Sequence, residues 1–204
     1  MYVVTLKQRD RREAGDTSEP ILRSLSGITA LTAFQPSGPT LLIGAPETAQ
    51  DTVNAVLIAL RHPGWSVGVG VGSLYEPVPT DAQYLQGTAL GYALTASERA
   101  EHTGDRVPLS VIGSNSELAS EAEAVLRLIG QLISKRSTAE WAVLDLLTPG
   151  VRGQQKYVAA ELGISAQAVS KAVVRSSWVE ELAARPAAAR LLRWVDAPGS
   201  TSGL

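Results

Sequence analysis

The stretch AELGISAQAVSKAV, residues 160–173, has the pattern of two short helices that meet at a tight corner. Ala159, just before it, is small enough for two helices to touch, and Gly163 can adopt the left-handed backbone angles that a turn needs. Ser165 is placed to cap the second helix. Together these spacings predict a helix-turn-helix, a motif whose second helix lies in the major groove of DNA.

The second predicted helix has an apolar side and a polar side. Ile164 and Val169 are expected to pack it against the first helix. On the other side, Gln, Ser, Lys and Arg can bond to base edges or phosphates, and a phosphate could bind the free N–H groups at the helix start. The residues predicted to contact DNA are Arg152, Gln155, Lys156, Ser165, Gln167, Ser170, Lys171 and Arg175. The alternative is a helical hairpin used only for packing or dimerisation.

The composition excludes several classes of site. The 204 residues include no cysteine and two histidines, so a disulfide framework, a thiolate metal site and a histidine-rich metal site are ruled out. The apolar runs are far shorter than the roughly 18 residues that would span a bilayer. The N-terminus is apolar first and basic second, the reverse of a secretory signal. We therefore expect a soluble cytoplasmic protein without a membrane partner.

The net charge of −2 is unevenly distributed along the chain. Residues 1–130 carry nine Lys and Arg against fourteen Asp and Glu, whereas residues 131–204 carry nine against six. An acidic first part and a basic second part predict two domains, the second of which faces a polyanion.

Upstream of the corner, apolar runs and turn signals predict an α+β domain with the order β-α-β-β-α-β-α-β. This is the ferredoxin-like, split βαβ arrangement with one further αβ unit. The glycines of WSVGVGVG, residues 65–72, do not match a nucleotide-binding loop. Glycine at every second strand position instead predicts a bare face that another backbone can approach closely.

The predicted organisation has four parts. Residues 1–113 form the α+β domain, and an amphipathic helix over 114–135, with Ser116 as its cap, links it to the second domain. Residues 136–195 form an all-α helix-turn-helix domain, which includes predicted helices at 165–184 and 186–195. A disordered tail is expected over residues 196–204.

Three further stretches, YVVTLKQRDRR, GWSVGVGVGSLYEPVP and GTALGYALTASERA, carry a family resemblance. With them the chain resembles the SatD-like family of bacterial proteins, which join a domain similar to the class III nucleotidyl cyclase (palm) fold to a C-terminal helix-turn-helix. In the cyclase-like pattern the first strand supplies a metal-binding Asp, and the following hairpin carries Gly-Asp-Glu. Here Lys7 stands near the first position and SGPT, residues 37–40, occupies the hairpin. The resemblance therefore implies a catalytically inactive domain without a metal or cofactor, because Lys and Pro cannot replace carboxylate ligands of Mg²⁺.

Two functions follow from these observations. The first is a dimeric DNA-binding transcriptional regulator whose inactive cyclase-like domain serves dimerisation or ligand sensing. The second is a nucleotidyl cyclase or transferase with atypical metal ligands and an accessory helix-turn-helix. Lys7, Arg9 and Arg11, at or beyond the end of the first strand, could bind an anionic ligand, or they could form a solvated loop. The expected partners are duplex DNA, a second copy of the chain and an anionic small molecule.

Overall fold

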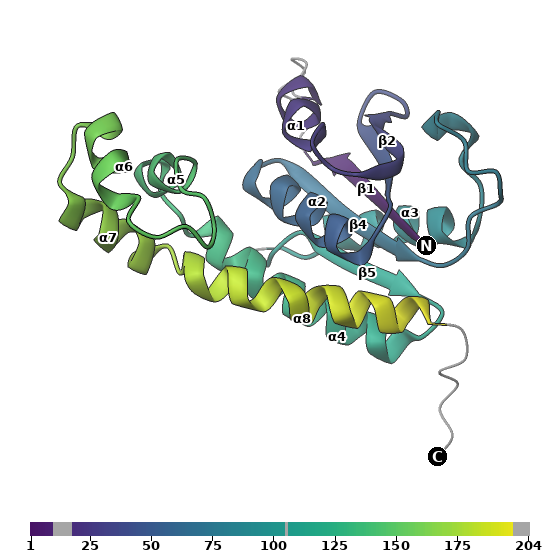
Figure 1. The fold of residues 1–204 in the computed structure, drawn as a ribbon. Coiled ribbons are helices and arrows are strands. Elements are labelled where there is room, and N and C mark those ends of the chain that lie inside the picture. The colour runs from purple at the N-terminus through teal and green to yellow at the C-terminus, as the bar shows by residue number, and fades with distance from the viewer. Residues whose placement is uncertain (10–17, 105, 198–204) are drawn as a thin grey trace.

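A five-stranded sheet forms the centre of the molecule, with strand order β2-β3-β1-β4-β5 (Figure 1). The computed structural model describes residues 1–9, 18–104 and 106–197. β1 pairs antiparallel with β3 and with β4, β2 pairs antiparallel with β3, and β5 lies parallel to β4. The strands are β1 (Tyr2–Gln8), β2 (Ala30–Pro36), β3 (Leu41–Pro46), β4 (Trp65–Val71) and β5 (Leu109–Gly113).

The helices alternate with these strands and then continue alone to the end of the described chain. They are α1 (Ser18–Leu25), α2 (Ala49–Arg61), the 3-10 turn η1 (Ala82–Tyr84), α3 (Thr88–Glu101), α4 (Ser116–Ser134), α5 (Thr138–Leu144), α6 (Gln155–Leu162), α7 (Ala166–Arg175) and α8 (Trp178–Asp196). The chain is thus a mixed α+β protein, and the predicted order of strands and helices up to β5 is confirmed. Within the described residues, none of these helices combines the length and apolar character that crossing a membrane would require.

β4 is covered on both faces, and its glycines explain how α3 packs against it. A Cβ at Gly68 would overlap backbone atoms of Ala93 and Ser97, and a Cβ at Gly70 would overlap the carbonyl oxygen of Ala89. The backbone of α3 therefore lies directly on the bare face of the strand, as the alternating glycines predicted.

α4 and α8 run side by side along the other side of the sheet (Figure 1). Ala188, Leu192 and Val195 of α8 belong to the same buried core as the sheet residues Val69 and Val111. This corrects two expectations. α4, capped by Asn115 rather than Ser116, is part of the core layer and not a free linker, and α8 belongs to the α+β part rather than to a separate C-terminal domain.

The helix boundary before α8 also differs from the prediction. α7 ends at Arg175, and Ser177 has a left-handed φ of 49°, so Ser176 and Ser177 separate α7 from α8 where one continuous helix was predicted. α8 then continues through Pro186, which is exposed and costs the helix one backbone hydrogen bond. Asp196 is its last residue and forms an ion pair with the N-terminal amine, so it is not part of a disordered tail. Residues 198–204 lie outside the described part of the chain.

The remaining helices, α5 to α7, form a small unit of their own, residues 137–177, which we call the helical unit. In Figure 1 it projects from the end of the α4–α8 pair, away from the sheet. Its core is separate from that of the sheet and consists of Val143, Val158, Ala159 and Val169, with Leu146, Leu147, Leu162, Ala172 and Val173 packed around them.

Candidate nucleic-acid interface

The corner between α6 and α7 is built as the sequence predicted, with one exception. Gly163 ends α6 with left-handed angles (φ 64°, ψ 31°), and the Ser165 hydroxyl accepts a hydrogen bond from the Ala168 N–H at 3.1 Å. Val169 is fully buried against α6. Ile164, however, is 40% exposed and does not pack the two helices together, because the space between them is already filled by the helical unit's core residues, including Leu162.

All eight residues predicted to contact DNA are exposed. On α7, Val169 faces the core of the helical unit, while Gln167, Ser170 and Lys171 lie on exposed positions. The Ser170 hydroxyl donates its proton to the carbonyl oxygen of Ala166 at 3.0 Å, so it is left as an acceptor. Among the described residues Lys171 has no carboxylate partner, which leaves its ammonium available to a phosphate or a base.

Arg175 is the one predicted contact residue whose charge is already paired within the described part of the chain. Its Nε lies 3.3 Å from Oε1 of Glu140, although 74% of the Arg175 side chain is exposed. Glu140 closes the capping box of α5: its carboxylate accepts the Ser137 N–H at 2.8 Å, and this hydrogen bond is the main cause of its lowered pKa. Arg175 would therefore have to exchange Glu140 for a phosphate in order to contact DNA.

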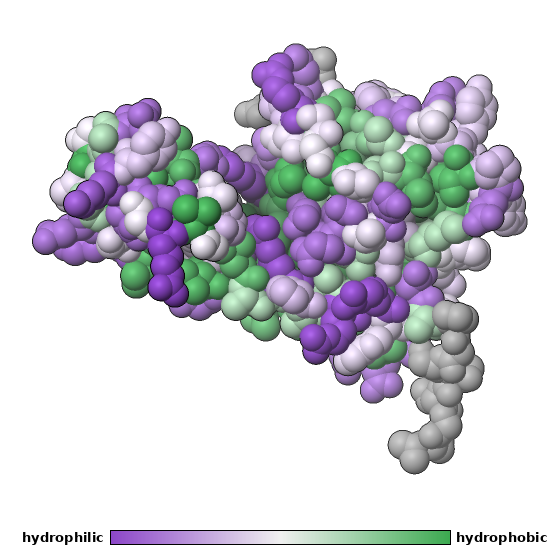
Figure 2. Space-filling model, viewed as in Figure 1, coloured by the Kyte–Doolittle hydropathy of each residue, from purple (hydrophilic) through white to green (hydrophobic). Residues whose placement is uncertain are grey.

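The charge of the helical unit is smaller than the basic C-terminal part of the sequence suggested. It contains four Lys and Arg against three Asp and Glu, because α8, which carries Arg185, Arg190 and Arg193, belongs to the other part of the molecule. Glu140 and Asp145 each form an ion pair, with Arg175 and Arg61 respectively. Figure 2 shows the helical unit as a lobe whose outer surface is mostly hydrophilic, with scattered apolar residues.

Two exposed apolar side chains stand near the polar ones, one on each helix of the corner. Tyr157 on α6 is 58% exposed and Val174 on α7 is 76% exposed. Apolar groups on such a surface can contact thymine methyl groups or sugars. Tyr157 was not among the residues predicted to contact DNA, although its sequence signal is an aromatic side chain next to the basic and polar run 152–156.

The structure does not bring the three proposed ligand residues together as free cations. Lys7 lies inside β1, and its Nζ pairs with Oε2 of Glu101 at 2.8 Å. Arg9 is exposed at the end of the strand and lines a pocket, whereas Arg11 lies outside the described residues. In the described part of the chain, no group of three His, Asp or Glu side chains is placed to hold a metal ion.

Comparisons with protein families, curated proteins and solved structures give no match to this chain. The arrangement of the side chains is therefore the basis on which a function can be assigned.

Proposed function

We propose that this protein is a DNA-binding transcriptional regulator and that α6 and α7 form its helix-turn-helix. The observation that carries the proposal is the two-sidedness of α7. Val169 fixes one side in the core of the helical unit, and the other side exposes Gln167, Ser170 and Lys171. A helix of ten residues is about 15 Å long, which suits insertion into the major groove.

The position of the helical unit supports this role. It projects from the body of the molecule, so that α7 could approach a duplex before the α+β part does (Figure 1). Arg152 and Lys156 precede or begin α6 and are exposed, and they are suited to contact the phosphates beside the groove.

We further propose that the α+β part is a ferredoxin-like, cyclase-related domain that has no catalytic activity. The order β2-β3-β1-β4 with three antiparallel pairs is the order such a domain has, and it agrees with the resemblance to the SatD-like family. At the end of β1, where a cyclase-like site needs a metal-binding carboxylate, Lys7 is held in an ion pair with Glu101. The hairpin beside it has Thr40 bonded through its carbonyl oxygen to the Gln8 N–H at 2.9 Å, and residues 37–40 supply no carboxylate. Cytoplasmic localisation is part of the same proposal.

Dimerisation completes the proposal, since one helix-turn-helix contacts a short half-site and two linked copies bind a longer sequence more tightly. α8 covers one side of α4, and Leu128 on α4 and Trp194 on α8 remain 64% and 49% exposed. We expect light scattering at micromolar concentration to give the mass of two chains. A monomer mass would contradict this part of the proposal.

The experiment that tests DNA binding is retardation of genomic fragments by the full chain, followed by selection of the bound sequences. We expect Lys171→Ala to weaken binding to a selected site by about tenfold, the effect of one lost charged contact. Arg190→Ala is the matched control, because it removes the same charge from an exposed position on α8, outside the helical unit. Absence of retardation at low salt, or equal losses in the two variants, would contradict the proposal.

A further inference from the structure

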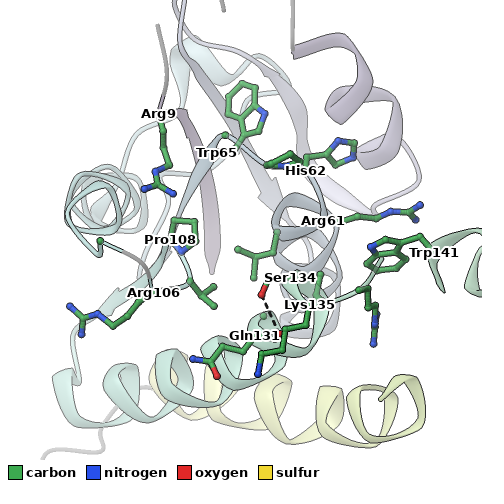
Figure 3. Close-up of a pocket in the computed structure, with 18 residues that line it drawn as sticks. Arg9, Arg61, His62, Trp65, Arg106, Pro108, Gln131, Ser134, Lys135 and Trp141 are labelled. Atoms are coloured by element: carbon green, nitrogen blue, oxygen red, sulfur yellow. Dashed lines mark hydrogen bonds between the residues drawn. The ribbon is translucent and has the colours of Figure 1, made fainter. Parts of the chain in front are cut away.

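A pocket of about 750 Å³ lies where the α+β part meets the helical unit. We call it the junction pocket. It is bounded by the end of β1, the turn from α2 into β4, the connection from α3 to β5, the last turns of α4 and the first turns of α5. Figure 3 shows Arg9 reaching from the end of β1 toward Pro108, and Arg61 beside the ring of Trp141.

The described residues that line the junction pocket are rich in cations and include no carboxylate. The cations are Arg9, Arg61, Arg106, Lys135 and Arg136. Two of them are neutralised from outside the pocket: Arg61 by Asp145, with both contacts at 2.6 Å, and Arg136 by Glu181 at 2.7 Å.

The other three cations have no carboxylate partner within the described residues. Arg106 donates from Nε to the carbonyl oxygen of Thr103 at 3.2 Å, which leaves its terminal nitrogens available, and Arg9 and Lys135 are exposed. A positive charge at Lys135 is favourable at the C-terminal end of α4, but that effect does not explain Arg9 or Arg106, which lie on other segments.

The remaining walls combine apolar side chains with the polar His62, Gln131 and Ser134 and leave room for an organic group. Trp65, Pro63 and Pro108 line them, and a Cβ at Gly64 or Gly104 would have no atom within 4 Å. A volume of about 750 Å³ is within the ~300–1,000 Å³ of small-molecule sites. Cationic side chains distributed along one pocket, with no carboxylate among its described lining residues, suit the several oxygens of a phosphate chain, which accept charge-assisted hydrogen bonds.

We propose that the junction pocket binds a small molecule carrying an oligophosphate group, either inorganic or on a nucleotide, and that Arg9, Arg106 and Lys135 bind its phosphates. This inference deepens the proposed function by giving the α+β part a ligand. It also explains how ligand binding would affect the helical unit, because the pocket wall includes Trp141 of α5. The Trp141 ring lies 4.2 Å from the Arg61 guanidinium and 4.8 Å from that of Arg136, and Arg136 is the chain neighbour of Lys135, so a phosphate bound at Lys135 would alter the contacts that hold α5.

The test is calorimetric titration of the full chain, without DNA and in a phosphate-free buffer, with pyrophosphate and with ATP. We expect both to bind with a dissociation constant below about 1 mM, and the Arg106→Ala/Lys135→Ala variant to bind at least tenfold more weakly. Tighter binding of ATP than of pyrophosphate would assign the nucleotide as the ligand class, and equal binding would assign the bare oligophosphate. The control is the double variant Arg190→Ala/Arg193→Ala, which removes two exposed positive charges outside the pocket and should bind as the wild type does.

Two results would overturn this inference. One is no heat with either compound up to about 10 mM, and the other is an equal loss of binding in the pocket and control variants. Measuring DNA retardation with the same variants distinguishes a protein that binds no oligophosphate from one that binds no DNA. If the pocket variant lost DNA binding and bound no oligophosphate, the pocket would belong to the DNA interface and the small-molecule assignment would be wrong.

Discussion

Replacing Glu181 by glutamine breaks the one fully buried charge pair among the described residues, which joins α8 to the segment between α4 and α5. Glu181 on α8 is completely buried, and Oε2 lies 2.7 Å from Nη2 of Arg136, with only 1% of either side chain exposed. The two atoms are not aligned for a hydrogen bond, so charge rather than hydrogen-bond geometry holds them. The variant leaves the Arg136 charge buried without a counter-charge.

The expected loss follows from which contacts remain. Removal of one partner from a buried pair costs about 3–5 kcal/mol in free energy of unfolding. Arg136 keeps the hydrogen bond from its Nε to the Ser176 carbonyl oxygen at 2.9 Å and its stacking on Trp141, which favours the lower end of that range. Arg185, the second partner of Glu181, is 31% exposed and can turn to solvent, so its release adds little.

Urea unfolding followed by circular dichroism and by tryptophan fluorescence measures this loss. Glu180→Gln is the control, because Glu180 is the exposed neighbour on the same helix and should change stability by less than about 0.5 kcal/mol. The apolar double variant Arg136→Met/Glu181→Leu should recover most of the loss, since it removes both charges together. A Glu181→Gln protein within about 1 kcal/mol of the wild type, or a double variant less stable than the single one, would refute this reasoning.

Two further predictions concern α3 and α5. Gly70→Ala should destabilise the protein by several kcal/mol or abolish soluble expression, because its Cβ would overlap the carbonyl oxygen of Ala89. Gly91→Ala is the control: its Cβ would point into open space, so the variant should be neutral or stabilise the protein by up to about 1 kcal/mol in thermal unfolding. An equal effect of the two glycine variants would contradict the close packing of α3 on β4. The pKa of Glu140 is lowered mainly by the hydrogen bond from the Ser137 backbone. Its ionised form therefore stabilises the fold fully at pH values above the unfolded-state pKa. This stabilisation is lost as the pH falls through the folded-state pKa. Glu140→Gln should therefore lose more stability at about pH 7 than at about pH 3 in urea unfolding, and equal losses at both values would contradict it.

The sequence predicted the parts of this molecule that depend on local patterns. The order of strands and helices up to β5 followed from apolar runs and turn residues, and the close approach of α3 followed from glycines at every second position of β4. Gly163 and Ser165 predicted the α6–α7 corner correctly because a left-handed turn and an N-cap are requirements of single residues.

The errors concern contacts between distant segments. The apolar stripe of α8 fits the surface of a small helical domain as well as it fits the sheet, so its sequence could not show that it returns to the α+β part. Pro186 suggested a helix boundary, but a proline can remain in a helix where the surrounding packing compensates for the lost hydrogen bond. The junction pocket was missed because Arg9, Arg106 and Lys135 are far apart in the sequence and line one pocket only in the fold.

The most direct test of the central claim, that α7 binds DNA, is the salt dependence of binding to a selected duplex, measured by fluorescence anisotropy with the full chain. Binding through phosphates releases counterions, so the logarithm of the association constant should fall linearly with the logarithm of salt concentration. We predict that Lys171→Gln weakens binding and, if the ammonium contacts a phosphate, lowers the slope by about one, while Arg190→Gln on α8 leaves both unchanged. Wild-type affinity and slope in Lys171→Gln, or the same change in both variants, would contradict the assignment of α7 as the DNA-binding helix.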